Sequence, residues 1–185
     1  PTTIDDVPNG VSGVVGVNSS LKTDSAKTRV DRMQDTGSEL KVLVGEHPAV
    51  RTHPETGRKI LVTLGGADPI NLTLQVLQAL KLVDVSGLET QIVVGPVNPH
   101  IDTLRQEIES GVSSFQLVIE SADMPQLMAW ADIAINAGGS TCWELCCLGV
   151  PMIIMVTSQD QALIGSGLEW EGCAKNLGRW DIDTG

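Results

Sequence analysis

The chain of 185 residues is long enough for one ordinary domain with an appendage, and its 42% of hydrophobic residues can build a sizeable core. Aromatic residues make up only 3%, with no Tyr and one Phe, so the core must be aliphatic. The 12 basic residues are outnumbered by 23 acidic ones, and no cluster of Lys and Arg offers the basic surface that nucleic acid requires, so we expect no nucleic-acid partner.

No apolar run approaches the roughly 20 residues of a membrane-spanning helix, and no signal peptide opens the chain. Cys142 and Cys146 would share a helix face, but a metal site there would need two further ligands that the sequence does not identify. The four cysteines have neither disulfide-framework nor CxxC spacing: Cys142, Cys146, Cys147 and Cys173. We expect reduced thiols, no metal, no cofactor, no transmembrane segment and a cytoplasmic location.

Residues 1–57 show little regular patterning, and we interpret them as a linker or the remnant of an interdomain region. Only Leu40–Val44 has the pattern of a strand. Because the chain begins at Pro1 without an initiator Met, we interpret it as a piece of a longer protein or as a processed product. The histidines have no partner pattern and are expected to lie in solvent: His47, His53 and His100.

A regular alternation of strands and helices begins at residue 58. The buried-type strand Lys59–Leu64 runs into the glycines Gly65 and Gly66, after which Asp68 can cap a helix and Pro69 can occupy its first position. One face of that helix is apolar: Leu72, Val76, Leu77 and Leu80.

Two further units follow the same pattern. The strand Thr90–Val94 leads through a turn to a helix that opens near Asn98. The strand Phe115–Ile119 leads to a short helix from Met124, which Asp123 is expected to cap. Each unit therefore predicts one strand and one helix.

The fourth strand, Ala131–Ile135, precedes the most informative stretch of the chain, Asn136–Glu144, and a helix follows. The fifth strand, Met152–Val156, leads through the Ser158–Gln161 loop to another helix, and a sixth strand begins near Ala174. This alternation predicts an α/β fold over residues 58–185, a Rossmann-like parallel sheet with helices on both faces.

The stretch Asn136–Glu144 has the outline of a nucleotide site. Gly138 and Gly139 carry no Cβ, so an anion can approach the backbone closely. The unpaired N–H groups at the start of the next helix suit a phosphate. Glu144 lies one turn after Ser140 and can accept two hydrogen bonds from a ribose diol.

The same residues also allow an interpretation without a ligand. Thr141–Glu144 fits a capping box, in which Glu144 would bind back to the N-cap backbone. Two glycines occur at many strand-to-helix turns that bind nothing. Against this, both Gly-Gly turns and the Ser158–Gln161 loop follow strands at the carboxyl edge of the sheet, where such sheets bind ligands. A Rossmann dehydrogenase is disfavoured because the third glycine of GxGxxG is missing.

Three segments together resemble a known family. Ile60–Pro69, Met124–Asp132 and Ala137–Glu144 are similar to the UDP-sugar hydrolase of pseudaminic acid biosynthesis and to related spore-coat polysaccharide proteins. More broadly, residues 58–180 resemble the C-terminal domain of a GT-B glycosyltransferase. The resemblance implies the UDP-sugar-binding half of a hydrolase that releases UDP. A donor domain of a true glycosyltransferase and a non-catalytic binding or assembly module are the alternatives.

The resemblance also implies a role for each site residue. The UDP diphosphate would be held by Gly138, Gly139, Ser140 and Thr141, and Glu144 would bind the ribose. Gly65 and Gly66 would face the sugar-phosphate, the uracil would lie near Ile119 to Met124, and Gln161 would contact the sugar. The residue before Gln161 departs from the family, because Asp160 stands where Asn is usual.

One expected feature is absent from the sequence. In this family a histidine of the N-terminal domain activates water, and no stretch here matches its setting, so we assign no catalytic residue. The resemblance therefore implies a missing N-terminal domain of the same protein as partner. It also implies that residues 58–185 form a nucleotide-sugar-binding domain truncated at its C-terminal end.

Overall fold

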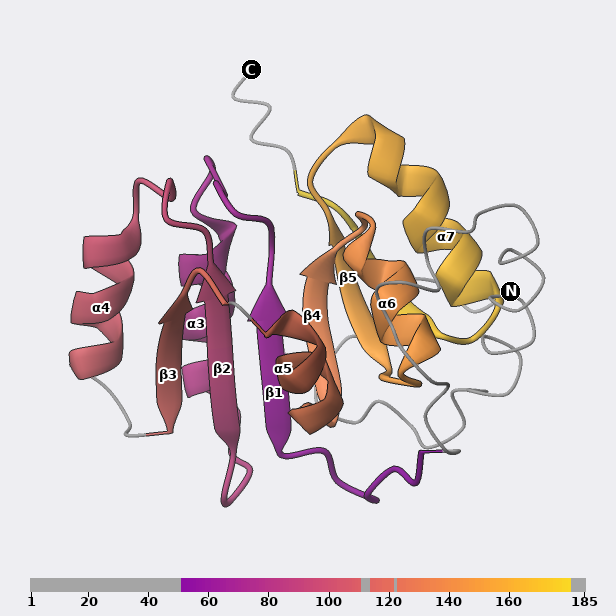
Figure 1. The fold of residues 1–185 in the computed structure, drawn as a ribbon, viewed down its shortest axis with the longest axis horizontal. Coiled ribbons are helices and arrows are strands. Elements are labelled where there is room, and N and C mark those ends of the chain that lie inside the picture. Colours follow the sequence, from indigo (N-terminus) through magenta and orange to yellow (C-terminus); the bar gives the residue numbers. More distant parts are fainter. Residues whose placement is uncertain (1–50, 111–113, 122, 181–185) are drawn as a thin grey trace, which may run out of the picture.

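The computed structural model describes residues 51–110, 114–121 and 123–180. They form one six-stranded sheet in the order β3-β2-β1-β4-β5-β6, in which every neighbouring pair is parallel (Figure 1). The strands are β1 (Lys59–Thr63), β2 (Glu89–Val94), β3 (Phe115–Ile119), β4 (Ile133–Ala137), β5 (Met152–Val156) and β6 (Ala174–Arg179). The predicted Rossmann-like α/β fold is confirmed.

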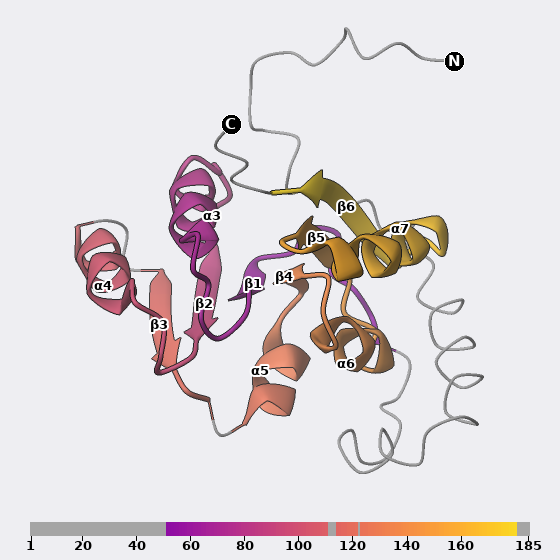
Figure 2. The same ribbon diagram turned by 90° about the horizontal axis from the view of Figure 1, so that it is seen from above.

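Helices cover both faces of the sheet, as predicted. They are α3 (Leu72–Lys81), α4 (Ile101–Glu109), α5 (Met124–Trp130), α6 (Thr141–Cys147) and α7 (Ala162–Trp170), with the 3-10 helix η2 (Gln159–Gln161) before α7. Figure 2 shows α3 and α4 on one face and α5 and α6 on the other. The apolar core on the second face also includes Leu168 of α7. None of the described helices is long and apolar enough to cross a membrane.

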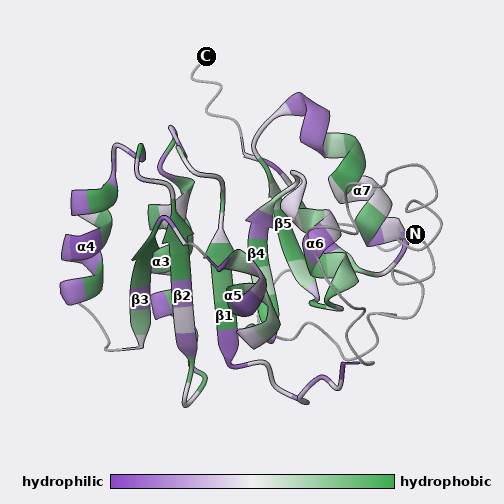
Figure 3. Cartoon of the chain, viewed as in Figure 1, coloured by the Kyte–Doolittle hydropathy of each residue, from purple (hydrophilic) through white to green (hydrophobic). Residues whose placement is uncertain are grey.

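The core is aliphatic, as the composition predicts. Successive residues of β1 alternate between the two faces, with Ile60 and Val62 packed on the α3 side and Leu61 on the α6 side. Figure 3 shows hydrophobic residues concentrated in the central strands and hydrophilic residues on α4. Phe115 is the only aromatic side chain buried among the described residues.

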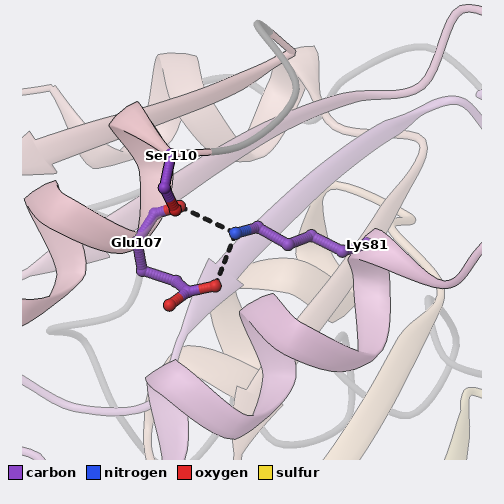
Figure 4. Close-up of polar contacts among 3 residues, drawn as sticks. All are labelled: Lys81, Glu107 and Ser110. Carbon is purple, nitrogen blue, oxygen red and sulfur yellow. Dashed lines mark hydrogen bonds and ion pairs between the residues drawn. The ribbon is translucent and has the colours of Figure 1, made fainter.

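Helices α3 and α4 are also joined by polar contacts. Lys81 forms an ion pair with Glu107 and donates to its carbonyl oxygen at 2.7 Å (Figure 4). The hydroxyl of Ser110 donates to the same carbonyl at 3.0 Å. The contacts of Lys81 with Glu107 connect the two helices on that face of the sheet.

The fourth strand differs from the prediction by two residues: β4 is Ile133–Ala137, not 131–135. The ladder with β1 starts only where Ile60 pairs with Ile133. Asp132, just before the strand, donates its N–H to the carbonyl oxygen of Lys59 at 2.7 Å, and its carboxylate accepts hydrogen bonds from the N–H groups of Arg58 and Lys59 at 2.9 and 3.0 Å. Asn136 therefore belongs to the strand.

Helix α3 begins at Leu72, three residues later than predicted. Asp68 and Asn71 have φ of 38° and 53°, a left-handed backbone that cannot belong to the helix. Asp68 nevertheless provides the cap, because its carboxylate accepts hydrogen bonds from the N–H groups of Leu72 and Thr73 at 2.9 and 2.8 Å.

Residues 1–50 lie outside the described residues, including the strand predicted at Leu40–Val44. Two residues of the segment 51–57 have contacts with the domain. Arg51 donates a hydrogen bond to the carbonyl oxygen of Ala131, and a Cβ on Gly57 would be 2.8 Å from Ile133. The predicted boundary at 57/58 and the C-terminal truncation stay predictions.

Candidate functional site

The order of the strands reverses between β1 and β4, and both Gly-Gly turns leave the sheet at that point. Thr63, the last residue of β1, pairs with Asn136 near the end of β4. The turns at Gly65 and at Gly138 therefore start side by side beyond the carboxyl ends of two adjacent strands. Parallel sheets bind ligands in the crevice at such a reversal.

The first turn is built for packing between backbones. Gly65 has φ of 100°, a conformation that side chains rarely adopt. Gly66 accepts a hydrogen bond from the N–H of Gly95 at 2.9 Å, and a Cβ on Gly95 would lie 2.7 Å from the Gly66 oxygen. Because Asp68 already fills the first N–H groups of α3, that helix end offers little to an anion.

The second turn, residues 138–141, differs from the first in the hydrogen bonding of its N–H groups. Within the described part of the chain, no group accepts a hydrogen bond from the amides of residues 138–141. The next two amides, those of Cys142 and Trp143, donate to carbonyl oxygens of Gly139 and Ser140 at 3.1 and 2.9 Å. Space beside the turn is open, because a Cβ on Gly139 would meet nothing within 4 Å.

The capping-box interpretation of this turn is wrong. Ser140 is the N-cap of α6 and makes no capping hydrogen bond through its side chain. Glu144 is half-buried, and no described residue gives its carboxylate a hydrogen bond or an ion pair. Burial raises the pKa of Glu144, since the charged form loses hydration. Its oxygens remain available to an outside donor.

Gln161 supports the second turn from the neighbouring loop. Its amide oxygen accepts hydrogen bonds from the backbone N–H and the hydroxyl of Thr157, at 2.9 and 3.0 Å. A Cβ on Gly138 would lie 3.0 Å from both the Cβ and the backbone oxygen of Gln161. Gly138 is therefore needed for this close packing, whereas Gly139 is not constrained in this way.

Met124 is the first residue of α5, beyond the carboxyl end of β3. It is half-buried and packs against the core on the α6 side. Asp123 caps α5 as predicted, because its carboxylate accepts a hydrogen bond from the N–H of Gln126 at 3.0 Å. Residue 122 lies outside the described residues, so the uracil position predicted for 119–124 is described only in part.

The histidines do not all lie in solvent as predicted. Both ring nitrogens of His53 are buried without a described hydrogen-bond partner, and burial, followed by the charge of Arg51, lowers its pKa. The charge of Asp132 has the opposite effect and raises the pKa of His53. Because the carboxylate of Asp132 also accepts a hydrogen bond from Lys59 at the start of β1, the ring of His53 lies near the edge of the sheet opposite the two turns. The ring of His100 contacts the Pro69 carbonyl oxygen at 3.4 Å. His47 lies outside the described residues.

Two other features lie apart from the second turn. A cavity of about 170 Å³ beside α3 is lined by residues such as Ile153, Met155 and Trp180, and by none of the predicted site residues. Among the residues that the structure describes, no group of three or more His, Cys, Asp or Glu could hold a metal ion.

Sequence reasoning missed the part played by Asn136. This side chain is fully buried at the end of β4 and bonds to groups on both sides of the second turn. The available signal was an amide at the end of an otherwise apolar strand, directly before the glycines.

Comparison with known proteins gives three findings. The model of the glycosyltransferase family 28 C-terminal domain matches residues 60–164. The spore coat polysaccharide biosynthesis protein SpsG of Bacillus subtilis is 35% identical over 126 residues, which cover 68% of this chain and 37% of that protein. The uncharacterized protein MJ1062 of Methanocaldococcus jannaschii is 29% identical over 113 residues, 60% of this chain and 23% of that protein. The chain thus matches well under half the length of either relative.

Proposed function

This chain belongs to the glycosyltransferase family 28 C-terminal domain family, and on that premise we propose that it binds the UDP part of a UDP-sugar. The observation that carries the proposal is the set of unpaired amides at residues 138–141, beside open space at the strand reversal. Four adjacent N–H groups can bind a diphosphate without any Lys or Arg.

Each predicted contact has a chemical basis in this arrangement. Gly138 and Gly139 provide backbone donors, and Ser140 and Thr141 add hydroxyl donors. Because α6 has only seven residues, the individual N–H groups rather than a long helix dipole would bind the diphosphate. Glu144 would accept hydrogen bonds from both ribose hydroxyls, and these would offset the hydration that its carboxylate loses on burial.

The remaining contacts lie around the diphosphate. Uracil would stack near Met124 at the start of α5. The amide nitrogen of Gln161 would reach the sugar, since its oxygen is already bound to Thr157. Gly65 and Gly66 would face the sugar-phosphate from the other side of the reversal.

For the whole protein we propose a cytoplasmic enzyme of surface polysaccharide or pseudaminic-type biosynthesis that hydrolyses a UDP-sugar. The support is the family and the name of the Bacillus relative. The catalytic base would come from an N-terminal domain, while the amides of residues 138–141 would stabilise the charge on departing UDP. Transfer of the sugar to an acceptor is the alternative, and product analysis of the whole protein distinguishes free sugar from a glycosylated acceptor.

Calorimetry of the 185-residue chain with UDP tests the binding site. We expect UDP to bind, and Ser140→Ala, Glu144→Ala and Gly139→Ala each to weaken binding. Gly167→Ala is the matched control, because a Cβ there also meets nothing within 4 Å but lies on α7. No heat at millimolar UDP would contradict the proposal. Variants that change only the melting temperature would favour the non-catalytic module.

A further inference from the structure

Asn136 links the two ends of the second turn. Its amide nitrogen donates to the carbonyl oxygen of Ala137 at 2.7 Å and to the sulfur of Cys142 at 3.0 Å. The Cys142 thiol in turn donates to the Ala137 carbonyl at 3.5 Å. These three groups form a closed set of contacts between the last residues of β4 and the first turn of α6.

This link is buried at a cost to the fold. Asn136 and Cys142 are both 0% exposed. The amide oxygen of Asn136 is buried without a hydrogen-bond partner among the described residues, which destabilises the folded state. An apolar residue would avoid that cost at this strand position, which follows the buried apolar residues Ile133, Ala134 and Ile135, so the amide calls for a reason beyond packing.

The chemistry of Cys142 suits such a link. Burial raises the pKa of its thiol to about 11, so the sulfur stays protonated and can accept from the amide while it donates to the carbonyl. Its neighbour in the core, Cys146, is on the same helix and is also buried, but the hydrogen bond described for its thiol is with Cys173. The link is therefore made by the cysteine in the first turn of α6.

We propose that Asn136 and Cys142 are positioning residues that hold the second turn, residues 138–141, so that its N–H groups point at the diphosphate. This inference rests on the proposed function and adds two residues that would not touch the ligand. A turn with two glycines is intrinsically flexible, and a fixed distance between its ends removes most of that freedom. The affinity for the diphosphate increases because a turn that is already ordered loses less conformational entropy on binding.

The test compares UDP with uridine, which lacks the diphosphate, by calorimetry on the 185-residue chain. Cys142→Ala should weaken UDP binding about tenfold and uridine binding by less than about twofold. Cys142→Ser, which keeps a donor and an acceptor, should restore most of the UDP affinity. Cys146→Ala is the matched control: it should lower the melting temperature as Cys142→Ala does, yet leave UDP affinity unchanged. A folded Asn136→Ala chain should show the same selective loss of UDP affinity as Cys142→Ala.

Two results would overturn the inference while leaving the proposed function intact. One is a Cys142→Ala chain that binds UDP as tightly as the original. The other is an equal loss of UDP and uridine affinity, which would indicate a general loss of structure. An original chain that binds neither compound would instead overturn the proposed function, and the inference with it.

Discussion

Burial raises the pKa of Glu144, and no described residue compensates its charge. The folded state therefore holds the proton of Glu144 more tightly than the unfolded state does. Stability then falls as pH rises from the unfolded pKa through the folded one, and the cost is fully present above the folded pKa. A carboxylate kept at such a cost is typical of a binding residue, since the ligand supplies the missing donors.

Replacement of Glu144 by Gln should separate stability from binding. At pH 7 we expect Glu144→Gln to raise the melting temperature, and the gain should vanish below the pKa of an ordinary Glu. UDP affinity of the original chain should fall as pH drops below the raised pKa, whereas the variant should bind weakly at every pH. Thermal unfolding and calorimetry across a pH series measure both effects.

The exposed carboxylate Glu55 provides the control for this experiment. Glu55→Gln should change neither the melting temperature at pH 7 nor UDP affinity. A Glu144→Gln chain that is less stable at pH 7 would contradict the prediction, since it would mean that the carboxylate is paired in the folded protein.

At the scale of elements, the two strand-to-helix turns differ in how the helix after the glycines is capped. Asp68 is 5% exposed and fills the first amides of α3 through two hydrogen bonds. Helix α6 has no such cap. The side chain of one residue thus decides which of two similar turns leaves the first N–H groups after its glycines without a capping side chain among the described residues.

Removal of this cap should cost more than removal of an exposed one. We expect Asp68→Ala to destabilise the fold by about 1–3 kcal/mol, because two buried N–H groups lose their acceptor. The melting temperature should fall by several degrees. Asp123→Ala, which removes one exposed hydrogen bond from the start of α5, is the comparison. An equal or smaller loss for Asp68→Ala would contradict the assignment, and thermal unfolding followed by circular dichroism measures both.

At the scale of the whole molecule, the net charge of −11 repels a nucleotide diphosphate. A site made of Lys or Arg would overcome that repulsion with its own charge, and salt would weaken it. A site made of backbone amides lacks such charges, so salt acts mainly on the repulsion between ligand and protein.

The affinity for UDP should therefore stay constant or rise as ionic strength increases. Calorimetry at about 50 and about 300 mM NaCl measures the change, with screening strongest at the higher value. Glu55→Gln, which removes one negative charge far from the turn, should show the same trend. A loss of affinity of several-fold at high salt would indicate that cationic side chains hold the diphosphate.

The sequence by itself determined the kind and order of the elements from β1 to β6. Local signals carry that information, because the periodicity of buried residues and the position of turn formers depend on nearby residues alone. It also placed Gly138, Gly139 and Glu144 together at one strand-to-helix turn. The sequence leaves open whether the turn binds a ligand, since a capping box fits the same residues.

Only the tertiary structure decided which groups in the turn are paired. The register between β1 and β4 brought Asn136 into the strand and against Cys142. Gly95 packs too closely against Gly66 to carry a side chain, and Gly138 packs tightly against Gln161, whereas a Cβ on Gly139 would meet nothing within 4 Å. The order of the strands set the two turns beside each other. These features arise from contacts between segments far apart in the chain, which no local pattern records.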